Sequence, residues 1–128
     1  MAKQIIKTDK APAPIGPYNQ AVKTGDLLFV SGQVAIDPAT NDLIAGSIKD
    51  EAHQVMKNLE AILTEAKVTF EHVVKTTIFL SDMGHFATVN EVYGSYFTGD
   101  YPARETVAVR TLPKNVNVEI SVIATLSL

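Results

Sequence analysis

Apolar and polar residues alternate along the last quarter of the chain and predict two strands there. The alternation covers residues 107–110 and resumes over residues 116–124, with the period of two that is typical of strands with one face in a core. The residues between them, 111–115, contain a proline and predict the turn of a hairpin. An arginine, Arg104, precedes the first strand, and a glutamate, Glu119, lies inside the second.

Further strand patterns occupy the first part and the middle of the chain, at residues 4–7, 21–23, 27–36 and 73–80. The turn at residues 24–26 contains a glycine and predicts that the second and third of these form a hairpin. Ser31 and Gly32 interrupt the apolar pattern, which indicates a bulge or the edge of a site. The polar residues 37–42 are interpreted as a loop, as are residues 11–17 with their three prolines.

Two stretches carry apolar residues at helical spacing. From Ile48 to Ala66 these residues recur at steps of three and four, and Ser47 is suited to cap the helix that they predict. We expect the apolar stripe of this helix to lie on the sheet and the following residues to face water: Lys49, Glu51, His53, Lys57 and Glu60. Residues 86–97 predict a shorter amphipathic helix with Asn90 beside its apolar stripe.

This order of elements predicts an α+β fold of two layers in a single domain, residues 1–128. Six strands would form one sheet, and both helices would cover the same face of it. The strands are apolar enough that the other face needs a cover as well. We therefore expect that face to pack against further copies of the chain in a closed cyclic oligomer.

The charge and residue content narrows the classes of partner. Eleven basic and 14 acidic residues give a net charge of −3 without any run of like charges, which disfavours a nucleic-acid or membrane-surface partner. The sequence has no long apolar run and no signal-peptide pattern at its start, so we expect a cytoplasmic protein. The absence of cysteine excludes thiol catalysis, and the three histidines lack metal-ligand spacing. We expect neither a metal nor an organic cofactor.

Glu119 is unusual because Val118 and Ile120 flank it, and burial of a carboxylate there is costly without a partner. Arg104 offers a planar fork that suits a carboxylate, either that of Glu119 or that of a ligand. Alternatively, Glu119 lies on the wet face of its strand and Arg104 is an ordinary surface charge. A plain five-residue hairpin loop would place the two on opposite faces. They would then meet only through a bulge, a longer loop or a subunit boundary.

Six collinear motifs cover nearly the whole chain. They are APAPIGPYNQA at residues 11–21, LLFVSGQVAID at 27–37, MKNLEAIL at 56–63, VVKTTIFLSDM at 73–83, FATVNEVY at 86–93, and YPAR at 101–104 followed by LPKNVNVEI at 112–120. Together they resemble the Rid family of enamine/imine deaminases. The resemblance implies a chorismate-mutase-like homotrimer with ligand clefts between subunits. It also implies a cofactor-independent hydrolysis of 2-imino acids to 2-oxo acids and ammonia.

The resemblance assigns roles to particular residues. Arg104 is similar to the arginine that holds the substrate carboxylate, and Glu119 to the residue that orients or activates water. The remaining pocket positions are Tyr18, Ser31, Gly32, Asn90 and Thr106. The chain departs from the usual family pattern at Asn19, Glu105 and Thr106. Glu105 adds a negative charge beside Arg104, which leaves the substrate preference open.

Two other functions remain alternatives. The first is a non-catalytic module that binds a 2-oxo acid at Arg104. The second is a ribonuclease or inhibitor of translation, a role attributed to members of the family, although the net charge of −3 argues against RNA binding. For the deaminase, we hypothesise that each cleft joins Arg104 of one subunit to Tyr18 of another, because a proline-rich arm precedes Tyr18.

Overall fold

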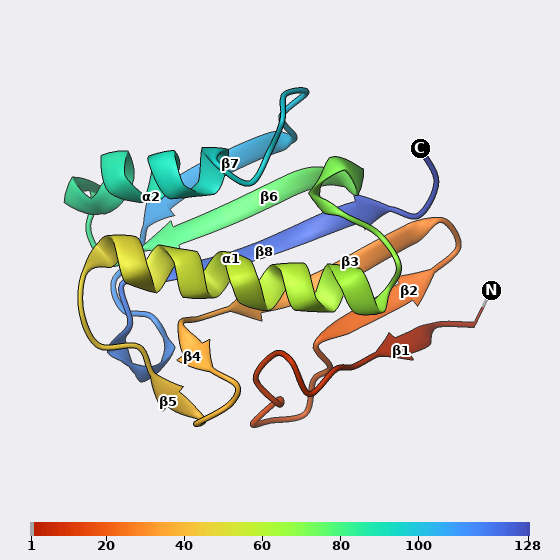
Figure 1. Ribbon diagram of the computed structural model, residues 1–128, viewed down its shortest axis with the longest axis horizontal. Helices are drawn as coiled ribbons and strands as arrows, with labels where there is room; N and C mark the ends of the chain where they lie inside the picture. The colour runs from red at the N-terminus through yellow and green to blue at the C-terminus, as the bar shows by residue number, and fades with distance from the viewer. Residues whose placement is uncertain (1) are drawn as a thin grey trace.

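The computed structural model describes residues 2–128 and contains one six-stranded mixed sheet with both helices on the same face (Figure 1). The strand order is β1-β2-β3-β8-β6-β7, and every neighbouring pair is antiparallel except β6 and β7. The predicted two-layer α+β fold is therefore confirmed. The elements of the main sheet are β1 (Gln4–Ile6), β2 (Ala21–Thr24), β3 (Leu27–Gln33), β6 (Val73–Leu80), β7 (Ala103–Ala108) and β8 (Val118–Thr125), and the helices are α1 (Ile48–Glu65) and α2 (Phe86–Gly94).

Helix α1 forms where the sequence predicts it. The hydroxyl of Ser47 accepts a hydrogen bond from the Asp50 N–H at 3.1 Å and so caps the first turn. The apolar stripe is fully buried at Leu59 and Ile62. The prediction for Glu51 is wrong, because this carboxylate faces the start of β8 and is buried there, where it accepts two hydrogen bonds from Asn117.

The predicted C-terminal hairpin is wrong. Strand β7 pairs with β6 in parallel, and β6 lies between β7 and β8. The chain returns through a short 3-10 segment, Pro113–Asn115, in which Lys114 and Asn115 have positive φ angles. Alternation shows which face of a strand is buried but not which strand is its neighbour. The central place of β8 agrees with the complete burial of every second residue along it.

Smaller features refine the predicted elements. The register shifts between Val30 and Gln33, so the bulge predicted at Ser31 and Gly32 is confirmed. Residues 37–42 are more than a loop, because a small second sheet closes there, formed by β4 (Ile36–Asp37) and β5 (Asp42–Leu43). Helix α2 begins at Phe86 as predicted but ends at Gly94.

The sheet face that points away from the helices carries exposed apolar side chains. Leu27 and Phe29 of β3, Ile5 of β1 and Val107 of β7 are each at least 40% exposed. Leu28, which lies between Leu27 and Phe29 on β3, is buried and points toward α1. This is the face on which we expect other copies of the chain to pack. Among residues 2–128, no helix is both long and apolar enough to span a bilayer.

Candidate active site

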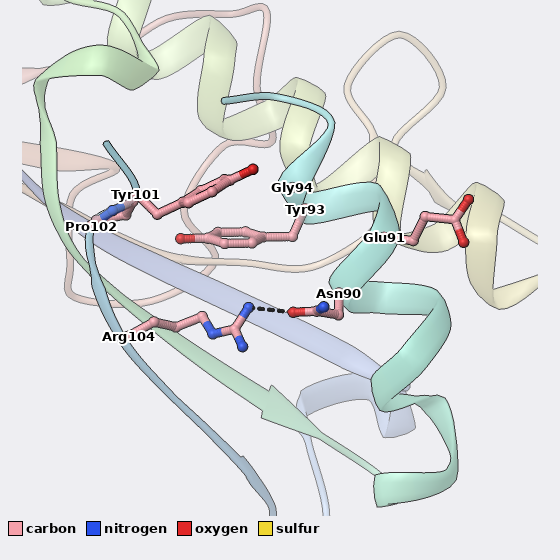
Figure 2. A pocket seen from close by; sticks show the side chains of 7 residues that line it. All are labelled: Asn90, Glu91, Tyr93, Gly94, Tyr101, Pro102 and Arg104. Atoms are coloured by element: carbon pink, nitrogen blue, oxygen red, sulfur yellow. Dashed lines mark hydrogen bonds between the residues drawn. The ribbon is translucent and has the colours of Figure 1, made fainter. Parts of the chain in front are cut away.

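Arg104 lies on β7 and reaches toward one side of α2. Phe86, Asn90 and Tyr93 are spaced four and three residues apart on that helix, so their side chains share its Arg104-facing side. A guanidinium N–H of Arg104 donates to Oδ1 of Asn90 at 2.6 Å, as Figure 2 shows. The guanidinium carbon lies 5.6 Å from the centre of the Phe86 ring and 5.2 Å from that of Tyr93. The helix thus holds the cation between an amide oxygen and two aromatic faces.

Arg104, Asn90 and Tyr93 lie at an open cleft of about 600 Å³. Its lining comprises Asn90, Glu91, Tyr93, Gly94, Tyr101, Pro102 and Arg104 (Figure 2). The Tyr93 hydroxyl donates to Thr76 Oγ1 at 2.9 Å, and burial raises the pKa of this phenol, so that its ring stays neutral beside the guanidinium. Arg104 is bound by an amide rather than by a carboxylate, which leaves its charge available to an anionic ligand.

Thr106 follows Arg104 on the same face of β7, since their partners on β6 are Ile78 and Thr76. Its hydroxyl oxygen is buried and has no hydrogen-bond partner within the described residues. A buried hydroxyl without a partner is costly, so this group is a candidate for contact with a ligand or with a second copy of the chain.

Glu105 points to the opposite face of the sheet. Its carboxylate lies 3.0 Å from the Lys75 ammonium and accepts a hydrogen bond from the Thr77 hydroxyl at 3.3 Å. The hydrogen bond from Lys75 lowers the pKa of the Glu105 carboxyl. The negative charge beside Arg104 in the sequence is therefore directed away from the Arg104 cleft and bound by a lysine.

Glu119 lies in a second cleft, which has a volume of about 130 Å³. Tyr18 and Gly32 also line this Glu119 cleft, together with Lys114 and parts of three loops. Burial raises the pKa of the Glu119 carboxyl above its ordinary value. A Cβ atom at position 32 would lie 2.6 Å from Oε2 of Glu119, so only glycine leaves room for the carboxylate in this position.

Ser31, which the resemblance assigns to the pocket, makes two hydrogen bonds within the chain. Its hydroxyl donates to the Asn19 carbonyl at 2.6 Å, and its N–H donates to the Gln20 carbonyl at 2.9 Å. Both bonds tie the bulge of β3 to the segment that carries Tyr18. Ser31 therefore fixes the position of this segment beside Glu119.

The predicted site residues fall into two groups on opposite faces of the sheet. Arg104 pairs with Thr76 of β6, whereas Glu119 pairs with Phe79 of the same strand, an odd number of residues away. One chain thus joins Arg104 with Asn90, and Glu119 with Tyr18 and Gly32, but it does not join the two groups. The predicted separation of Arg104 and Glu119 holds even though the hairpin that implied it does not form.

Three residues near the two clefts were not predicted from the sequence as site residues. Phe86 and Tyr93 belong to the apolar stripe of the helix predicted over residues 86–97, and in the structure their rings also flank Arg104. Their spacing from Asn90 carried this signal, because positions four and three apart share one side of a helix. Lys114 lines the Glu119 cleft from a turn, where only the preceding proline marks its position. No group of three or more His, Asp or Glu side chains within residues 2–128 is arranged to hold a metal ion.

Comparison with known protein families shows which family the chain belongs to. The model of the family described as endoribonuclease L-PSP matches residues 8–126. The chain belongs to this family. A solved structure from Yersinia pestis, described as a member of the conserved Rid protein family, superposes with a TM-score of 0.94 at 46% identity and covers 97% of this chain and 99% of that one. The resemblance to Rid proteins is thereby confirmed.

Two further similar proteins are relevant to the site, one through its name and the other through its bound ligand. A mouse protein named 2-iminobutanoate/2-iminopropanoate deaminase is 48% identical over 122 residues, which cover 95% of this chain and 90% of the mouse protein. The structure of Escherichia coli TdcF with bound serine has a TM-score of 0.93 at 40% identity and covers 97% of this chain and 99% of that chain.

Proposed function

We propose that the protein hydrolyses 2-imino acids and their enamine tautomers to 2-oxo acids and ammonia. The observation that carries this proposal is the guanidinium of Arg104, which Asn90 and two rings hold in place while its charge remains available. A 2-imino acid carries a carboxylate that matches this fork. The 48% identity with the mouse deaminase supports the same class of reaction.

The chemistry needs two positioned groups. Arg104 binds the carboxylate and places the neighbouring C=N carbon, with Thr106 beside it as a hydroxyl donor. The Glu119 carboxylate takes a proton from water as the water oxygen bonds to the carbon of the protonated imine, which gives a tetrahedral amino alcohol. Glu119 then returns this proton to nitrogen. As the C–N bond breaks and ammonia leaves, Glu119 accepts the proton of the hydroxyl group, which becomes the C=O of the 2-oxo acid, and the proton passes to solvent. Orientation and a modest acid–base contribution suffice, because imines hydrolyse readily in water.

This site requires more than one copy of the chain. Arg104 and Glu119 lie on opposite faces of one sheet, so a substrate that contacts both takes them from different copies. The apolar face at Leu27, Phe29 and Val107 supports such an assembly, which we propose is a homotrimer. Tyr18 would accompany Glu119, since both line the same cleft.

A coupled assay tests the proposed function. An amino-acid oxidase generates 2-imino acids from a panel of amino acids, and a trapping reagent for the imine reports how much escapes hydrolysis. The protein should lower the trapped fraction and accelerate release of ammonia. A protein that binds 2-oxo acids in calorimetry but leaves imine decay unchanged would be a binding module instead.

A ribonuclease activity is the second candidate, favoured by the description of the family as endoribonuclease L-PSP. The net charge of −3 opposes it, because RNA binding draws most of its strength from contacts with phosphates. The same preparation should be incubated with RNA. Cleavage that survives Arg104→Ala and Glu119→Gln would come from a contaminant or from another site.

A further inference from the structure

Few polar side chains within residues 2–128 are buried, and most of these lie near the Glu119 cleft. The buried polar residues are Gln20, Gln33, Glu51, Asn58 and Thr76. Gln20, Glu51 and Asn58 each make at least two hydrogen bonds to segments that line, or lead into, the Glu119 cleft. These three come from different parts of the chain, and each holds a different wall of the cleft.

Gln20 holds the wall formed by the proline-rich segment. Its side-chain amide donates to the carbonyls of Thr8 at 3.0 Å, Ala11 at 3.2 Å and Pro12 at 2.9 Å. Its oxygen accepts from the Thr8 N–H at 2.7 Å. Pro12 lines the cleft, and the segment then leads to Tyr18. One side chain that is 2% exposed thus fixes the first part of this segment.

Glu51 fixes the wall of the cleft that is formed by the segment between β7 and β8. Its carboxylate accepts from the backbone N–H of Asn117 at 2.8 Å and from the side-chain amide of Asn117 at 3.0 Å. Asn117 also accepts from the Ser81 hydroxyl at 2.8 Å and from the Ser81 N–H at 3.0 Å. Asn117 lies between Lys114, which lines the cleft, and Glu119 itself. The carboxylate therefore fixes the chain on both sides of Asn117.

Asn58 holds the third wall, at the end of β3. Its amide donates to the carbonyls of Val34 at 3.1 Å and Ile36 at 2.9 Å, and both of these residues line the cleft. Its oxygen accepts from the Gln54 amide at 2.9 Å. The Val34 carbonyl also accepts from the Ile36 N–H at 2.8 Å, so Asn58 adds a second bond there and ties both carbonyls to α1.

We infer that Gln20, Glu51 and Asn58 are positioning residues that preorganise the Glu119 cleft for water activation. The catalytic part of this inference rests on the proposed function. Buried polar groups contribute little net stability compared with apolar packing, but a fully bonded network specifies one geometry. Three such groups around one carboxylate set the distance between Glu119 and a bound water and limit the access of bulk water to it.

Three isosteric variants test this inference: Gln20→Glu, Glu51→Gln and Asn58→Asp. Each keeps its shape but turns a donor into an acceptor, or the reverse, against the groups that it binds. We expect kcat for imine hydrolysis to fall about 10- to 100-fold, because small displacements of a catalytic group are costly. Affinity for 2-oxo acids at Arg104 should remain close to that of the wild type. The control Ile62→Val removes one buried methyl group away from both clefts and should lower the melting temperature without changing kcat.

The pKa of Glu119, measured by NMR with labelled glutamate, gives a readout that does not depend on the reaction. Tyr18 and Lys114 are the other ionisable side chains that line the same cleft. A loosened wall admits water, so Glu51→Gln, the variant that adds no carboxylate, should bring the Glu119 pKa down toward its ordinary value. This shift would support the inference even if the wild type hydrolysed no imine, in which case only the proposed function would fail.

The double variant Glu51→Gln/Asn117→Asp exchanges amide and carboxylate and so preserves every hydrogen bond of that wall. It should recover both the kcat and the Glu119 pKa that Glu51→Gln loses. Folded single variants that keep the wild-type kcat and the wild-type Glu119 pKa, with only a lower melting temperature, would overturn the inference. Failure of the double variant to recover either quantity would overturn it as well.

Discussion

Arg104 and Glu119, two charged side chains of one sheet, point in opposite directions. Their partners on β6, Thr76 and Phe79, are three residues apart, which places the guanidinium on the helix-covered face and the carboxylate on the bare one. Each lies in its own cleft. A reaction that uses both therefore depends on the way in which copies of the chain meet.

Replacement of the cation tests its role in binding. Arg104→Ala should weaken 2-oxo acid binding by about 2–5 kcal/mol, the cost of losing one partner of a desolvated charge pair. Arg104→Lys should recover little, because lysine lacks both the planar fork and the stacking on Phe86 and Tyr93. Calorimetry with pyruvate measures both variants. Arg110→Ala, an exposed arginine, is the matched control, and equal losses in the two alanine variants would contradict the assignment.

Glu119→Gln should abolish proton transfer while it leaves 2-oxo acid binding intact. It should also change the pH dependence of stability. Burial raises the Glu119 pKa, so as pH rises above the ordinary glutamate range the unfolded chain ionises first and the wild type loses stability. The variant lacks this loss, and its advantage in melting temperature should grow from pH 4 toward neutral pH. A constant difference across this window would contradict a raised pKa. The exposed Glu65→Gln serves as control.

Gly32→Ala should act on the reaction through Glu119. The new methyl group would lie 2.6 Å from Oε2 of Glu119, so the carboxylate must move. Loss of glycine flexibility within a strand favours the fold by about 0.5–1 kcal/mol, which helps to keep the variant folded. We expect kcat to fall about 10-fold or more. In the Glu119→Gln background the same change should have no further effect on kcat, and additive losses would show that it acts elsewhere.

Local pattern was sufficient to predict most elements but not their neighbours. Helix α1 and strand β6 appear at their predicted positions because amphipathic spacing and β-branched residues are strong local signals. The pairing of β7 with β6 was missed, since a crossover through α2 leaves the same alternation as a hairpin. Glu51 was placed in water for a similar reason: its partner, Asn117, is 66 residues away in the sequence.

The sequence singled out individual candidate residues but not the contacts that arrange them. Arg104 and Glu119 stood out because charges are unusual at such positions in apolar strands. That Asn90 holds the guanidinium, and that Ser31 holds the segment before Tyr18, depends on contacts between distant segments. Such contacts leave no periodic signal in a single sequence.

Thr106→Val tests the unpaired hydroxyl of β7. The Thr106 oxygen is buried without a partner within the described residues, so its removal should raise the free energy of unfolding by about 1 kcal/mol. If this oxygen serves a ligand, the same change should weaken 2-oxo acid binding. Chemical denaturation and calorimetry measure the two effects. A loss of stability would show that the hydroxyl already has a partner in the assembled protein.

A mixed assembly tests whether Arg104 of one copy and Glu119 of another form a single site. Arg104→Ala and Glu119→Gln, each inactive alone, are unfolded together at equal concentrations, refolded, and assayed for imine hydrolysis, with mixing confirmed by native mass spectrometry. If each site takes Arg104 from one copy and Glu119 from the next, about one quarter of the sites in randomly mixed trimers contain both native residues. We expect about that fraction of wild-type activity. Activity no higher than the average of the two parents, in a confirmed mixture, would contradict it.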